Sequence, residues 1–154
     1  MPKDHTKIKK HSKELLAKLG FDAEPIVTQQ EEIIFVNLLI DQPGLLIGRG
    51  GEGLDALQHV LRLLISRDEE ITYTNIVVDI SGYRDKKIEN VKKLARDKAY
   101  LVISTGIDET LPEMSSYERR VVHMVCADIA EVETESAGEG RERKVVIKPK
   151  KATK

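Results

Sequence analysis

The sequence has no tryptophan, and aromatic residues make up only 4% of its 154 residues, so a core built from it must be mostly aliphatic. Cys126 is the only cysteine, which excludes an intrachain disulfide and fits a reducing compartment. No apolar run approaches the roughly 18 residues of a membrane span. The polar first residues do not resemble the apolar core of a secretory signal. We therefore expect a cytoplasmic protein without membrane insertion.

Acidic residues are scarce at both ends of the chain, although the net charge of the whole chain is only -1. Residues 1–20 carry six Lys against Asp4 and Glu14, and residues 141–154 carry seven Lys and Arg against Glu142. These ends are +4 and +6, so the stretch between them is -11. Basic ends favour a polyanionic partner at particular surfaces. For the last residues, including the basic tail 151–154, a merely solubilising role is the alternative.

The apolar pattern predicts an α+β chain made of two small domains. In the first domain, 6–82, we expect a helix, two strands, a short apolar turn, a helix and a strand, at 6–19, 25–30, 33–40, 45–47, 52–66 and 73–80. In the second, 83–150, we expect a long helix, a second helix starting near Ser115, and two strands, at 84–103, 131–135 and 144–147. This order predicts a three-stranded sheet in the first domain and a small α/β unit after it.

A glycine-rich loop, Gly48-Arg49-Gly50-Gly51, precedes the helix that opens at Glu52. Glycines lack a Cβ and let a sugar-phosphate backbone approach the main chain. The amide groups at the helix start and the Arg49 charge can meet a phosphate. This is the GXXG arrangement with which KH modules clamp about four nucleotides. The alternative is an ordinary turn, and it is the surrounding order of elements that favours the KH interpretation.

The same stretch also reads Gly48-x-Gly50-x-x-Gly53, the fingerprint of a dinucleotide-binding enzyme. Three observations weigh against a cofactor. The glycines do not directly follow a strand, the chain is too short in βα units for a doubly wound sheet, and no catalytic set of residues accompanies them. We expect no cofactor, no small-molecule substrate and no enzymatic activity.

Arg119 and His123 lie four residues apart on the helix that starts near Ser115, and therefore share a face. Together they can present a guanidinium and an imidazole to one phosphate or base, whereas Arg120 is expected at a different azimuth. Residues 115–118 fit a capping box. The plainer alternative pairs Arg119 with a nearby carboxylate and leaves His123 as a surface or half-buried histidine. His123 and Cys126 could suggest a metal, but a closed zinc site needs four ligands, and the sequence offers no others at a suitable spacing.

The helix 84–103 has one apolar and one basic face. The basic face is expected to hold seven cations, namely Arg84, Lys86, Lys87, Lys92, Lys93, Arg96 and Lys98. Such a face can follow a nucleic-acid backbone. Tyr83 and Tyr117 are the candidates for base stacking, unless they belong to the core.

The sequence resembles the bacterial Jag family, RNA-binding proteins in which a type II KH domain precedes an Arg-x-x-x-His (R-3-H) domain. The resemblance is carried by LLIGRGGEGLDAL at 45–57, VVDISGYR at 77–84, SYERRVVH at 116–123 and VETESAGEGRERKVVI at 132–147. Many relatives begin with a further N-terminal domain. We expect this sequence to be a short form without it. The Arg-Gly at the middle of the loop, where relatives often have Lys-Arg, suggests weaker binding.

The resemblance implies a single-stranded RNA-binding protein that acts in post-transcriptional regulation or as an RNA chaperone, with single-stranded DNA as a second ligand. It implies that the loop and the Arg–His pair bind RNA, and we expect the RNA to run across the basic helix face between them. The expected RNA-binding residues are Gly48, Arg49, Gly50, Gly51, Lys92, Lys93, Arg96, Arg119, Arg120 and His123. A protein-interaction adaptor, with another KH protein as its partner, is the alternative of a different class.

Overall fold

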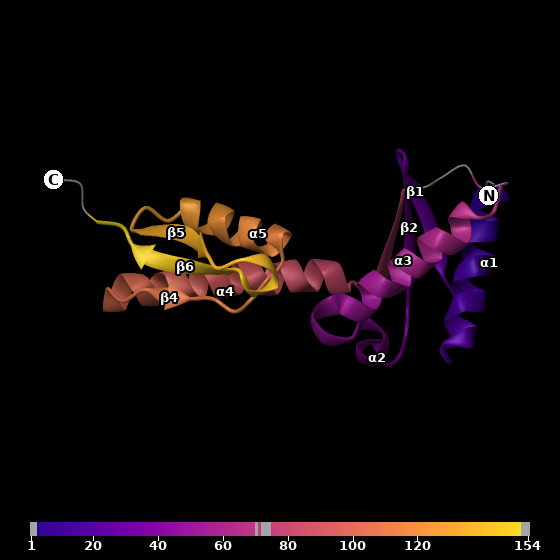
Figure 1. Cartoon of the computed structure of the whole chain (residues 1–154), viewed down its shortest axis with the longest axis horizontal. Coiled ribbons are helices and arrows are strands. Elements are labelled where there is room, and N and C mark those ends of the chain that lie inside the picture. The colour runs from indigo at the N-terminus through magenta and orange to yellow at the C-terminus, as the bar shows by residue number, and fades with distance from the viewer. Residues whose placement is uncertain (1–2, 70, 72–74, 152–154) are drawn as a thin grey trace. The chain divides into compact units, whose positions relative to one another are not determined.

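The computed structural model describes residues 3–69, 71 and 75–151 (Figure 1). The chain divides into two compact units, residues 1–84 and 85–154. Each unit has its own aliphatic core and its own three-stranded sheet. The α+β class predicted from the sequence is confirmed.

The first unit is built on a mixed sheet in the order β1-β2-β3. Its elements are α1 (Lys3–Lys18), β1 (Ile26–Gln30), β2 (Ile33–Leu38), α2 (Pro43–Ile47), α3 (Glu52–Ser66) and β3 (Ile76–Ile80). β1 is antiparallel to β2, and β3 is parallel to it. α1 packs on β1, α3 packs on β3, and the two helices contact each other, so they cover one face of the sheet.

Alternating side chains explain why these strands lie flat against the helices. Along β2 every second residue is buried, as are the first, third and fifth residues of β3. The matching helix side chains include Ile8 and Leu16 of α1, and Leu54 and Leu61 of α3, each at most 2% exposed. Burying an aliphatic side chain of this size contributes about 1.5–3 kcal/mol.

The basic residues of α1 are largely neutralised within the first unit. Lys7 and His11 contact the Asp68 carboxylate at 3.2 and 3.1 Å. Lys9 and Lys13 contact Glu24 at 2.7 and 2.6 Å. Hydrogen bonds from Lys13 and Lys9 hold the pKa of Glu24 at about 2. The positive excess of residues 1–20 therefore serves internal ion pairs, and the expectation of a polyanion-binding surface there loses its support.

The second unit has an antiparallel sheet in the order β4-β6-β5. Its elements are α4 (Tyr83–Thr105), which begins at the last two residues of the first unit, β4 (Glu109–Thr110), α5 (Ser116–Ala127), β5 (Val132–Ala137) and β6 (Lys144–Pro149). Its core joins the helices to the sheet and includes Val91, Ala95, Ala99, Val102, Val122, Cys126, Val145 and Ile147.

The start of α5 is fixed by the predicted capping box. The Ser115 hydroxyl accepts from the Glu118 amide at 3.2 Å, and the Glu118 carboxylate accepts from the Ser115 amide at 2.7 Å. Lys87 adds an ion pair to Glu118 at 3.1 Å. Burial raises the pKa of Glu118, but the bonds from Ser115 and Lys87 outweigh it and leave the pKa below its ordinary value. The cap is thus charged at neutral pH and anchors α5 to α4.

The element boundaries differ from the predicted ones in a few places. α1 begins at Lys3, α4 extends to Thr105, and the two-residue strand β4 was not predicted, because two residues carry no periodicity. β3 begins at Ile76, and the first part of the predicted strand 73–80 lies outside the described residues, as does most of the tail 151–154. No helix in the described part is both long and apolar enough to cross a bilayer.

Candidate nucleic-acid interface

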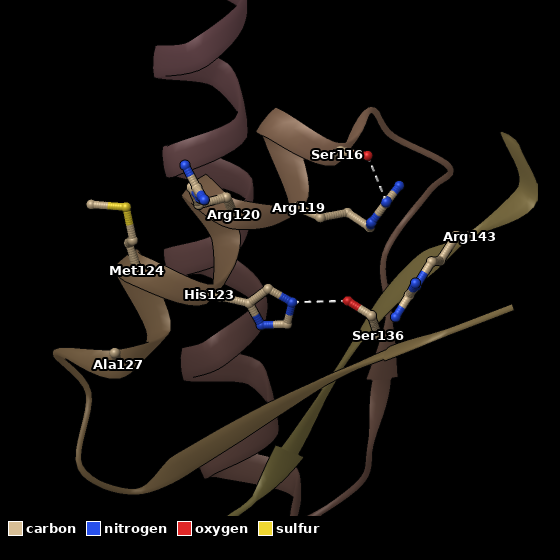
Figure 2. A pocket seen from close by; sticks show the side chains of 8 residues that line it. All are labelled: Ser116, Arg119, Arg120, His123, Met124, Ala127, Ser136 and Arg143. Carbon is tan, nitrogen blue, oxygen red and sulfur yellow. Dashed lines mark hydrogen bonds between the residues drawn. The ribbon is translucent and has the colours of Figure 1, made fainter. Parts of the chain in front are cut away.

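A shallow groove of about 510 Å³ runs along one face of α5 in the second unit (Figure 2). Six of its lining residues come from α5, one from β5, and one from the segment before β6. They are Ser116, Arg119, Arg120, His123, Met124, Ala127, Ser136 and Arg143. The α5 residues recur at intervals of three and four, so they form one stripe of the helix. The opposite stripe, with Glu118, Val122 and Cys126, is buried in the core.

Arg119 forms no ion pair with a carboxylate among the described residues. Its guanidinium donates to the Met114 carbonyl oxygen at 2.8 Å and to the Ser116 hydroxyl at 2.9 Å. A guanidinium has five N–H donors, so others are left for a ligand. The alternative expectation, that Arg119 pairs with a nearby carboxylate, is wrong. The two bonds fix the side chain without cancelling its charge, as an anion site requires.

His123 connects α5 to β5 through both of its ring nitrogens. Nδ1 lies 2.7 Å from the Thr134 hydroxyl, and Nε2 lies 2.9 Å from the Ser136 hydroxyl. Burial lowers the pKa of His123, and the charges of Arg119 and Arg143 lower it further. The ring is thus neutral at neutral pH, with one nitrogen donating and the other accepting. His123 is half-buried and forms a wall of the groove rather than a free cation.

Arg143 is a groove residue that was not singled out from the sequence. It is exposed, and within the described ranges its side chain makes no hydrogen bond or ion pair. In Figure 2 its guanidinium, that of Arg119 and the ring of His123 approach the same region beside Ser136. In the sequence it was counted only with the basic end 141–154 and within the segment 132–147 that carries the family resemblance. This side of the groove thus combines two arginines with the ring of a histidine.

Arg120 also lines the groove, and as the next residue after Arg119 it leaves α5 at a different azimuth, as expected. It precedes His123 by three residues, a spacing that places two helix residues on one face. The side chain nevertheless extends away from Arg119 and His123, on the same side as Met124 (Figure 2). Arg119 and Arg120 therefore contribute to two different sides of one groove.

The α4 cations expected to bind RNA do not line this groove. Lys92 forms an ion pair with Glu89 at 2.7 Å, whereas Lys93 and Arg96 are outside the groove lining. Lys87 and Lys98 are paired with Glu118 and Glu109. The helix face is therefore much less positive than the sequence suggested, because carboxylates far away in sequence neutralise part of it.

The glycine loop of the first unit is shaped mainly by packing. A Cβ on Gly53 would lie 2.3 Å from the Leu46 carbonyl oxygen, and one on Gly48 would lie 3.0 Å from the Gly53 nitrogen. Both glycines thus allow α2 and α3 to approach closely. Gly50, with a φ of 61°, has open space where a Cβ would be, and Arg49 is exposed with no side-chain partner among the described residues. Gly48, Arg49 and Gly50 are exposed, so they are the part of the loop that a ligand can reach, whereas Gly51 is buried.

Tyr83 occupies the space beside Gly51. A Cβ on Gly51, whose φ is 91°, would lie 3.0 Å from Cε1 of the tyrosine ring. The next residue, Arg84, donates through Nε to the Val78 carbonyl oxygen at 3.0 Å and through Nη2 to Asp55 at 3.2 Å. Tyr83 is partly buried against the first core, so it supports the loop from behind. Of the two tyrosines considered for stacking, only Tyr117 is largely exposed, at 62%.

The end of the loop also carries negative charge. Glu52 and Asp55 lie in the first turn of α3, where carboxylates interact favourably with the helix dipole. They compete with any phosphate for the positive end of that helix. Arg49 is the single cation within the loop, so the loop has no net excess of positive charge once Glu52 is counted.

Comparisons with known proteins match both parts of the chain. The R-3-H domain family matches residues 89–149. Over 133 residues, or 86% of the chain, the sequence is 33% identical to the "RNA-binding protein KhpB" of Clostridium symbiosum and 31% identical to that of Lactiplantibacillus plantarum. Over 127 residues, or 81% of the chain, it is 32% identical to that of Bacillus subtilis.

The matched regions cover 60%, 41% and 61% of these three relatives, so the chain spans roughly three fifths of their length or less. The R-3-H match contains α5, all three strands of the second sheet and most of α4. These matches confirm the resemblance predicted from the sequence, because the matched KhpB proteins are the Jag proteins. The chain carries an R-3-H domain at residues 89–149 and is homologous to the bacterial RNA-binding proteins KhpB.

Proposed function

We propose that this protein binds single-stranded RNA, with the α5 groove of the R-3-H domain as its principal contact. The observation that carries the proposal is the uncompensated positive charge of the groove, where Arg119 is fixed by neutral partners and Arg143 is unpaired among the described residues. Arginines offer planar arrays of donors that match phosphate oxygens. The relatives named RNA-binding proteins support the same conclusion.

The first unit would act as a type II KH module and a second, weaker contact. Its order of elements, helix–strand–strand–helix–loop–helix–strand, is the one the KH interpretation requires, and its loop exposes Arg49 and Gly50. The path from this loop to Arg119 and His123 remains a prediction, as do the roles of Lys92, Lys93 and Arg96. In the cell, the protein would act in post-transcriptional regulation or as an RNA chaperone.

The test is a titration of labelled single-stranded RNA with the full chain and its variants. Arg119→Ala should weaken binding about tenfold or more, since hydrogen bonds to a charged group contribute about 1.5–3 kcal/mol, and Arg49→Asp combined with Gly50→Asp should weaken it less. Two modules on one strand gain from effective concentration, so combining the changes should exceed either alone. A folded Arg119→Ala variant with unchanged affinity for a long RNA would contradict the proposal. Measuring the affinity for single-stranded DNA of the same sequence shows whether the protein distinguishes ribose from deoxyribose.

A second candidate function is that of a protein-interaction adaptor. The outer face of α3 exposes Val60, Leu63 and Leu64 at 41%, 51% and 36%. These positions share one side of the helix and form an apolar stripe of the kind found at protein contacts. Another KH protein is a partner that such a face could take. Replacing Leu63 with Glu should abolish a protein complex and leave RNA affinity unchanged, whereas the RNA-binding proposal predicts the reverse for Arg119→Ala.

A further inference from the structure

The α5 groove has two chemically different sides. On one side lie Arg119, His123, Ser136 and Arg143, which offer hydrogen bonds and positive charge. On the other side Arg120 and Met124 extend together, away from the histidine (Figure 2). A groove meant only for phosphate could use the charge of Arg120 but would gain nothing from the thioether of Met124 beside it.

The second side consists of large, exposed and adaptable groups. Met124 is 64% exposed, and Arg120 is exposed with no side-chain partner among the described residues. Tyr117, at 62% exposure, lies three residues before Arg120 and seven before Met124, so the three are neighbours along the same side of α5. Outward-facing helix positions are usually charged or small. An aromatic ring, a planar guanidinium and a thioether together point to a planar ligand.

We propose that Tyr117, Arg120 and Met124 form a platform on which a nucleobase stacks while its phosphate occupies the Arg119–Arg143 side. This inference rests on the proposed function and adds the orientation of the nucleotide. A guanidinium stacks on planar rings. A thioether makes favourable contacts with aromatic systems, and base–aromatic stacking tolerates any sequence because every base has a π-face.

The occupant we assign is an unpaired base rather than another protein. The positive charge of Arg120 lies between Tyr117 and Met124 in sequence, and the platform adjoins the cationic side through the shared residues of one helix stripe. Both features complement a nucleotide. The faces of bases in a duplex are covered by their neighbours, so the platform would favour single strands without reading a sequence.

The experiment compares an oligouridylate of about ten nucleotides, long enough for a site of this kind, with an abasic ribose-phosphate strand of the same length. The full chain carries Arg49→Asp throughout, so that the loop contributes little. The platform variants are Arg120→Lys, which keeps the charge and removes the stacking plane, and Met124→Ser. Ile103→Ser is the matched control, because Ile103 is 40% exposed and lies outside the groove.

Each platform variant should bind oligouridylate about fivefold more weakly, near the lower limit of the stacking contribution of one base. It should bind the abasic strand unchanged, and its dependence on salt should be the same because no charge is lost in Met124→Ser or in Arg120→Lys. Ile103→Ser should change neither affinity. Arg119→Ala should weaken both strands equally.

The outcomes separate the two claims. Equal losses on both strands, or no loss on either, would overturn the platform. If Arg119→Ala still weakened binding in that case, the proposed RNA-binding function would stand without it. If Arg119→Ala also had no effect, the proposed function itself would fail. A second readout is oligouridylate with one central 2-aminopurine, whose quenching on binding should decrease in the platform variants and persist in Ile103→Ser.

Discussion

The glycine loop of the first unit and the α5 groove of the second differ in how their charge is presented. The loop has a recognisable motif, but Gly48, Gly51 and Gly53 are constrained by packing, and Arg49 is followed closely by Glu52. The groove rests on a two-residue signature, but its arginines are held by neutral groups or are unpaired among the described residues.

This difference shows that a well-defined sequence motif does not by itself indicate a strongly binding site. Three of the glycines can be explained by close approach within the fold, which any packed loop between helices could require. The charge of Arg119 has no such explanation, because its carbonyl and hydroxyl partners would be satisfied equally by a neutral donor. We therefore expect the groove to dominate RNA affinity.

The largest expected effect is that of Arg119→Ala on RNA affinity. Hydrogen bonds to a charged group contribute about 1.5–3 kcal/mol, which corresponds to roughly 10- to 100-fold in affinity. Fluorescence anisotropy with labelled RNA measures the loss. Because Arg119 also bonds to Met114 and Ser116, circular dichroism must show that α5 persists. Arg119→Lys, which keeps the charge and loses the fork of donors, should be intermediate.

The next effect concerns the stability of the loop. Gly53→Ala should lower the free energy of unfolding by about 1–3 kcal/mol, because the new methyl group meets the carbonyl oxygens of Leu46 and Ile47. Helix propensity alone predicts the opposite sign, since alanine is favoured over glycine by about 1 kcal/mol. Gly44→Ala is the matched control, in the helix α2 and with open space around it. Urea denaturation measures the free energy of unfolding of both variants. If Gly53→Ala were as stable as Gly44→Ala, the packing account would be contradicted.

The third effect is a dependence on pH that only the groove should show. The folded pKa of His123 is lowered by burial and by the two arginines, so its protonation favours the unfolded chain. The resulting stability is complete above about pH 6.5, the ordinary value, and is lost as pH falls through the lowered folded pKa. The melting temperature should therefore fall more between about pH 7 and about pH 5 in the natural protein than in His123→Gln. If the melting temperatures of the two proteins fell in parallel with pH, the pKa of His123 would not be lowered by folding.

The smallest expected effect concerns the negative charge at the end of the glycine loop. Glu52→Gln should increase RNA affinity about two- to threefold, within the range of a solvent-exposed charge interaction. Glu32→Gln, in the exposed turn between β1 and β2, controls for the change in overall charge. Equal gains in both variants would mean that net charge alone acts, and that the loop is not a phosphate contact.

Much of the fold followed from the sequence because its signals are periodic. α3 was predicted with the observed bounds, Glu52–Ser66, since four leucines recur at helical spacing before a change to polar residues. The capping box placed the start of α5 for the same reason, a fixed local spacing. The two-residue strand β4 has no such periodicity, and only its pairing with β6 defines it.

The site was less predictable because charge pairing joins residues that are far apart in sequence. The ion pairs of Lys87 with Glu118 and of Lys98 with Glu109 decide which α4 cations remain, and no local pattern shows them. Arg143 joins Arg119 only because β5 and the segment before β6 lie beside α5. The role of Tyr83 beside Gly51 likewise depends on tertiary packing.

The most direct test of the account compares two single substitutions, Arg143→Ala in the groove and Arg49→Ala in the loop. Both side chains are exposed and have no partner within the described ranges, so neither change should disturb the fold, and each removes one positive charge. The affinity for one single-stranded RNA, measured at several salt concentrations, gives the contribution of each. The account predicts a clearly larger loss for Arg143→Ala. A loss for Arg49→Ala that equals or exceeds the loss for Arg143→Ala would contradict it.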